Sequence, residues 1–67
     1  MKKGTVKWFN PVKAFGFIKP DEGGKDIFVH VSQFKKAGIT DILEGIQLEY
    51  QLEEFRGRTI AANIKKI

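Results

Sequence analysis

Short runs of alternating apolar and polar residues, separated by residues that favour turns, dominate this sequence. The clearest run is LEGIQLEYQLEE, residues 43–54, whose regularly spaced apolar members are Ile46, Leu48, Tyr50 and Leu52. Successive side chains of a strand point to opposite faces, so this spacing is typical of a β-strand with one buried face. The pattern therefore predicts a fold built from strands.

Four more strands are expected, at residues 3–10, 14–19, 26–31 and 59–67. Asn-Pro after the first, PDEGGK after the second and RGR before the last supply turn residues. One helical turn is expected in SQFKKAG, with Ser32 as its N-cap and Gly38 at its end, although so short a segment is not a stable helix by itself.

With 67 residues and no cysteine, the chain has a small core and no disulfide to reinforce it. We expect a single domain spanning residues 1–67. An open sheet of this size would leave exposed edges, whereas a closed five-stranded barrel pairs most of them. The predicted fold class is all-β, a five-stranded antiparallel barrel.

Catalysis, metals and cofactors find little support in the composition. With one histidine, one serine and no cysteine, the chain has few side chains from which to build a nucleophile–base pair or a zinc site. Asp26 and His30 lie four residues apart on an expected strand, roughly 13 Å and far beyond hydrogen-bond reach. We therefore predict a protein that is not an enzyme and needs no metal or cofactor.

The N-terminal stretch MKKGTVKWFN has no apolar run of signal-peptide length, and no run in the chain approaches the length of a membrane span. The simplest expectation is a soluble, cytoplasmic monomer that does not bind a membrane.

Charge and aromatic residues are concentrated in the same half of the chain. Residues 1–36 hold eight lysines against three acidic residues, and also six of the eight aromatic residues. Residues 37–67 hold four basic and five acidic residues. Interleaved positive charge and flat rings indicate a nucleic-acid partner. The alternative at this level is a solubilising lysine surface over an aromatic core.

The alternation decides which way the rings point. In the expected strand 26–31, Ile27, Val29 and Val31 share an aliphatic face, so that face is the better candidate for the core. Phe28 then points outward together with Asp26 and His30. The neighbouring strand 14–19 turns Phe15 and Phe17 outward, next to Lys13. The opposite assignment would bury Asp26 and His30.

Exposed, clustered phenylalanines beside lysines call for a ligand. Bases stack on aromatic faces irrespective of their identity, and lysines attract phosphates. A small barrel that binds a protein or peptide partner through the same rings is the alternative from another class. Salt dependence separates the two, because phosphate contacts weaken steeply as salt rises.

The motifs KWFN, KAFGFI and DIFVHV, in this order and spacing, closely resemble the bacterial cold-shock protein family, in which the last two are called RNP1 and RNP2. The resemblance covers essentially the whole chain. It implies an OB-type barrel that binds single-stranded RNA and DNA with low specificity and melts RNA secondary structure as an RNA chaperone. Carried over by position, the binding residues are Lys7, Trp8, Lys13, Phe15, Phe17, Asp26, Phe28, His30 and Arg56.

Several positions depart from the pattern of that family. Strict alternation would put Trp8 on the same face as Val6, so an outward Trp8 requires a bulge between them. Ala14 stands where RNP1 usually has glycine, and a positive φ there would strain it. An aromatic residue common in the family is replaced by Val31 and another by Ile39, and the proline near Arg58 and Thr59 is missing. Phe55 is an additional aromatic residue in that last region.

Overall fold

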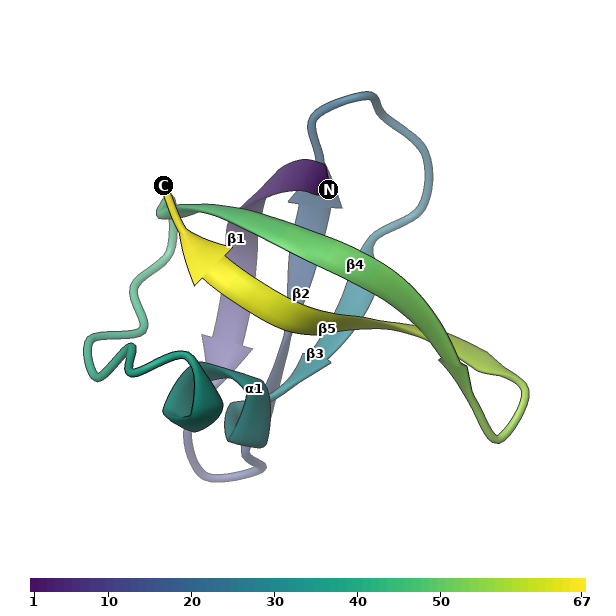
Figure 1. Cartoon of the computed structure of the whole chain (residues 1–67). Helices are drawn as coiled ribbons and strands as arrows, with labels where there is room; N and C mark the ends of the chain where they lie inside the picture. The colour runs from purple at the N-terminus through teal and green to yellow at the C-terminus, as the bar shows by residue number, and fades with distance from the viewer.

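The computed structural model describes residues 1–67 as a closed barrel of five strands with one short helix (Figure 1). The strands follow one another around the barrel in the order β1-β2-β3-β5-β4, and pairing of β1 with β4 closes it. The prediction of an all-β, five-stranded barrel is confirmed. The elements are β1 Lys2–Asn10, β2 Phe15–Pro20, β3 Ile27–His30, α1 Val31–Lys36, β4 Gln47–Phe55 and β5 Arg58–Lys66.

Four of the five strand pairings are antiparallel, and the fifth is a short parallel contact in which Phe28 of β3 lies opposite Ile60 of β5. The long β4–β5 hairpin crosses over the β1–β2–β3 sheet, and its tip projects away from the rest of the chain (Figure 1). The structure thus divides into a three-stranded meander and a two-stranded hairpin packed over it.

The core follows the alternation read from the sequence. Val29 of β3 and Ile18 of β2 are fully buried, and Leu48 and Tyr50 of β4 face them from the opposite wall. Ala61, Ile64 and Val6 complete the strand contribution, while Phe34 enters from the helix. The aliphatic face of β3 therefore does lie inside.

One prediction for β4 is wrong, and β5 departs from simple alternation. Leu52 was expected on the buried face, yet 45% of it is exposed. In β5 the neighbouring residues Ala61 and Ala62 are both buried. A bulge in β5 opposite Tyr50, where the register shifts and Asn63 takes a φ of 49°, interrupts the alternation of β5, whereas Leu52 of β4 stays on the face of Tyr50 and lines the same hollow as Tyr50. Beyond this bulge the hairpin no longer lies over the core.

The helix begins earlier than the sequence predicted. His30, and not Ser32, is the N-cap, because the His30 Nδ1 accepts a hydrogen bond from the backbone N–H of Ser32 at 3.1 Å. Val31, expected in the strand, is therefore the first helical residue. Six residues suffice because Phe34 is fully buried against the core and packs edge-on against Phe9. No helix in the chain is long and apolar enough to cross a membrane.

In the turn between β1 and β2, Ala14 has the positive φ that the sequence analysis associated with strain. Its φ is 64°, in the left-handed region, so β2 begins one residue later than predicted, at Phe15. The strain is held in place because the Ala14 N–H donates to the Asn10 carbonyl and the Ala14 carbonyl accepts from the N–H of Val31. The Asn10 side chain also accepts two backbone N–H groups within the turn.

Replacing Ala14 with glycine is expected to raise the free energy of unfolding. The left-handed conformation costs a residue with a Cβ roughly 1–2 kcal/mol, and added flexibility of the unfolded chain returns about 0.4–1 kcal/mol of this. Ala14→Gly should therefore stabilise the barrel by about 0.5–1 kcal/mol in a denaturant titration. Ala37→Gly, at a φ of −84°, is the matched control and should destabilise it. A destabilised Ala14→Gly protein would contradict the strain.

Candidate nucleic-acid interface

A bulge in β1 turns Trp8 away from the core. Val6 lies opposite Ile18 and Trp8 opposite Phe17, so Lys7 is an extra residue without a partner in β2. Val6 is 1% exposed and Trp8 is 41% exposed, although strict alternation would place them on the same face. The bulge inferred from Trp8 in the sequence is therefore present.

Gly16 permits this geometry. A Cβ at Gly16 would lie 2.4 Å from the carbonyl oxygen of Trp8 and less than 3 Å from two atoms of Phe9. Two of these three atoms belong to the backbone of β1, which cannot rotate away as a side chain can. The glycine in KAFGFI thus lets β1 and β2 approach closely enough for Trp8 to join the rings of β2.

Four rings meet on the outer surface of the β1–β2–β3 meander, and we call them the aromatic patch: Trp8, Phe15, Phe17 and Phe28. Phe15 is central, with its ring centroid 5.7 Å from that of Trp8 and 5.3 Å from that of Phe28. These three ring planes lie within 28–29° of one another from neighbour to neighbour. Phe17 packs edge-on against all three.

The patch forms because three strands place rings side by side. Phe17 lies directly opposite Phe28 in the β2–β3 ladder, and Phe15 lies opposite His30. Cross-strand neighbours of this kind touch on one face of a sheet. The result is a row of three rings, partly open to solvent, whose neighbouring centroids lie 5.3–5.7 Å apart and whose neighbouring planes are inclined by 28–29°.

Positive charge surrounds the patch, but not all of it is free. Lys7, in the bulge, is paired with Asp26 at a distance of 2.9 Å from Nζ to the carboxylate. Lys13 is exposed in the turn before Phe15 and has no ion pair. The guanidinium of Arg58 lies over the ring of Phe28, 5.3 Å from its centroid. The structure thus joins two of the predicted site residues, Lys7 and Asp26, to each other.

His30 lies at the edge of the patch with its ring orientation fixed. Its Nδ1 accepts the Ser32 N–H and lies 3.0 Å from Ser32 Oγ. The tautomer that fits this hydrogen bond carries its proton on Nε2, the ring nitrogen not engaged by Ser32. The exposed imidazole therefore offers a hydrogen-bond donor beside the rings.

Arg56, the last predicted site residue, lies apart from the four rings at the tip of the β4–β5 hairpin. Its guanidinium is over Phe55, 5.3 Å from the centroid of that ring. The family resemblance selects Arg56 as a binding residue but not Arg58, whose guanidinium lies over the patch ring Phe28. The alternation of β5 gives no sign of this contact, because it depends on how β5 lies beside β3.

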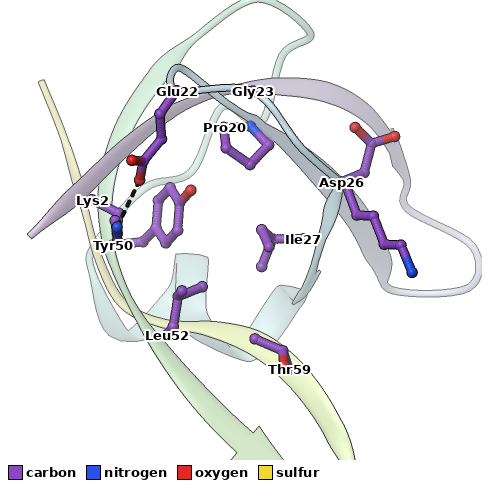
Figure 2. Close-up of a pocket in the computed structure, with 10 residues that line it drawn as sticks. Lys2, Pro20, Glu22, Gly23, Asp26, Ile27, Tyr50, Leu52 and Thr59 are labelled. Carbon is purple, nitrogen blue, oxygen red and sulfur yellow. Dashed lines mark hydrogen bonds and ion pairs between the residues drawn. The ribbon is translucent and has the colours of Figure 1, made fainter.

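Apart from the aromatic patch, a hollow of about 500 Å³ lies at one end of the barrel (Figure 2). The ion pair of Lys2 and Glu22, 2.7 Å apart, spans its rim. Hydrogen bonding to Glu22 raises the pKa of Lys2, and burial raises the pKa of Tyr50, which lines the hollow. Its lining carries both signs of charge and its one aromatic ring, Tyr50, is buried in the core. It offers no stacking surface comparable to the aromatic patch.

Known proteins of one family are similar to this chain along nearly its whole length. The sequence model of the family described as the 'Cold-shock' DNA-binding domain matches residues 2–67. The chain is 45% identical over 67 residues to the probable cold shock protein y4cH of Sinorhizobium fredii and 43% identical to the cold shock protein CspA of Rhizobium meliloti; each match covers 97% of both chains. It is also 48% identical to a segment of glycine-rich protein 2 of Nicotiana sylvestris, covering 92% of this chain and 29% of the plant protein.

Substituting Gly16 tests the close approach of β1 and β2. Gly16→Ala is expected to cost about 3 kcal/mol in unfolding free energy, at the upper end for overpacking, because backbone atoms must move. Where the protein remains folded, the emission of Trp8 should also change. Gly38→Asn is the control, since an added Cβ there meets nothing within 4 Å and asparagine tolerates its φ of 75°. Equal stability of the two variants would show that the approach is not required.

Proposed function

We propose that this chain, which belongs to the cold-shock domain family and binds nucleic acid, acts on single-stranded RNA and DNA with low sequence specificity. The observation that supports single strands is the row of three rings, Trp8, Phe15 and Phe28, each stacked on the next and partly open to solvent. Bases in a duplex are stacked on one another and cannot reach such rings, whereas unpaired bases can.

Stacking supplies most of the affinity in this proposal. Each base that stacks on an aromatic ring contributes about 1–3 kcal/mol, and every base has a face to offer. The rings therefore bind a strand without reading its sequence. Phe17, which meets its neighbours edge-on, holds the row in position and presents its own edge to the strand.

The charged residues around the patch position the strand. Lys13 and Arg56 have no carboxylate partner, so both are free to contact phosphates. Lys7 is held by Asp26, a partly exposed pair whose stabilising effect is small, and a phosphate can take the place of the carboxylate. His30 donates from Nε2 to a base or a phosphate. These roles cover the nine residues that the family resemblance selected.

We also propose that the protein acts as an RNA chaperone. A hairpin in RNA opens transiently, and a protein that binds only the open strand shifts the equilibrium toward the melted form by its differential affinity. No ATP is needed, since binding energy alone drives the shift. The chain acts stoichiometrically, as one cold-shock domain that spans residues 1–67.

Titration of Trp8 fluorescence tests the preference for single strands. Trp8 is the only tryptophan, so its emission reports directly on the patch. We expect strong quenching by oligo-dT, weak quenching by a duplex of the same length, and weaker binding as salt is raised. Quenching by the duplex as strong as by the single strand would contradict the proposal. Salt-independent binding would instead favour a peptide-type apolar site.

Alanine at Phe15, compared with alanine at Phe34, separates binding from folding. Phe15→Ala should weaken single-strand binding by about 1–3 kcal/mol and reduce the opening of a fluorophore-labelled RNA hairpin without ATP, while the barrel stays folded. Phe34→Ala removes a ring that is 0% exposed and should lower stability by about 3–5 kcal/mol. If Phe15→Ala unfolds the protein but leaves the affinity of its folded fraction unchanged, the patch does not bind the strand.

A further inference from the structure

The tip of the β4–β5 hairpin carries a second group of aromatic and cationic side chains. Phe55 and Arg58 lie opposite each other and flank the two-residue turn Arg56-Gly57. Phe55 is 59% exposed, more than any ring of the aromatic patch, and Arg56 lies over it. The core does not require an exposed phenylalanine at this point, because the tip projects beyond the barrel (Figure 1).

A groove joins this tip to the aromatic patch. It has a volume of about 680 Å³, with Phe28 and His30 on the side of the patch and Phe55, Arg56 and Arg58 on the side of the hairpin. Arg58 bridges the two sides, since it extends from the hairpin and its guanidinium lies over Phe28. The groove therefore starts at the last ring of the row and ends at Phe55.

The charge of the groove suits a polyanion. Arg56 and Arg58 both line it and neither forms an ion pair. Glu53 is the only carboxylate in the lining, so the cationic groups outnumber it. Guanidinium groups bind phosphates through paired hydrogen bonds and also stack on flat rings. A single strand offers both partners, in alternation along its length.

The backbone conformation of the turn also supports a role in binding. Arg56 has a φ of 52° and Gly57 a φ of 77°, the pair of positive values that a two-residue type I′ hairpin turn requires. Asparagine or glycine would fit the first position with less strain than arginine does. A residue that accepts such strain on an exposed turn is a candidate for a role in binding.

We propose that this groove is an additional subsite for the single strand. The strand continues from the aromatic patch past Arg58, its next base stacks on Phe55, and Arg56 and Arg58 bind the phosphates of this segment. The proposal rests on the function proposed above and adds two residues, Phe55 and Arg58, to the binding surface. It also lengthens the binding surface, because a strand must cross the groove before it reaches Phe55.

The affinity for oligo-dT strands of different lengths tests this subsite. The strands span about 4 to about 16 nucleotides, the range of site sizes of OB folds. Affinity of the unaltered protein should rise with length and then level off. Phe55→Ala should bind the shortest strands normally and lose about fivefold or more for strands long enough to cross the groove. Leu43→Ala, which removes another exposed apolar side chain away from the groove, should match the unaltered protein at every length.

The role of Arg58 is tested by removing its charge. Arg58→Gln should weaken the binding of long strands and reduce its salt dependence, because one phosphate contact is lost. Lys65→Gln removes a positive charge outside the groove and should have a smaller effect. Equal losses in the two variants would mean that Arg58 acts only through net charge, and would overturn its place in the subsite.

A reporter at the tip distinguishes failure of this inference from failure of the function. In a Trp8→Phe, Phe55→Trp protein, long strands should quench the new tryptophan and the shortest should not. No quenching at any length, together with normal quenching of Trp8 in the unaltered protein, would overturn the subsite and leave the proposed function standing. Absence of single-strand binding by the unaltered protein would overturn both the subsite and the proposed function.

Discussion

The contact between the backbone of β1 and Gly16 of β2 determines where the aromatic residues of this chain can lie. Only a residue without a side chain leaves room for the carbonyl of Trp8 at that point. The approach allows a bulge of one residue, and the bulge reverses the side on which the rest of β1 presents its side chains. Val6 can therefore fill the core while Trp8 joins the surface rings.

The interior of the barrel is correspondingly dependent on the residues that remain. A barrel of this size holds few side chains, and Phe34 closes one end of it from a helix of only six residues. His30 serves both regions, because its Nδ1 caps that helix while its ring lies beside the patch. The residue that marks the edge of the surface site is thus also part of the structure that completes the core.

Alternation in the sequence was sufficient to place most of the patch. It sorted Phe15, Phe17 and Phe28 outward and Val29 inward, and the conflict over Trp8 indicated the bulge. It could not show that Leu52 is exposed, since this depends on how far the β4–β5 hairpin extends beyond the core (Figure 1).

Two other features were beyond the reach of a pattern in the sequence. The cap of the helix depends on the rotamer of His30, and the position of Arg58 over Phe28 depends on the parallel contact of β3 with β5. Both arise from side chains and strands that meet only when the barrel is closed. Local periodicity describes each strand, but not how distant strands align.

The double pairing of β1 has a thermodynamic consequence. β1 pairs with β2 from Gly4 to Asn10 and with β4 from Lys2 to Thr5, so the hairpin cannot separate from the meander without breaking a ladder of this strand. Unfolding therefore involves the whole barrel, and the patch is lost with the core. A ligand that binds only the folded patch must then add its binding free energy, by mass action, to the stability of every strand, including those it never contacts.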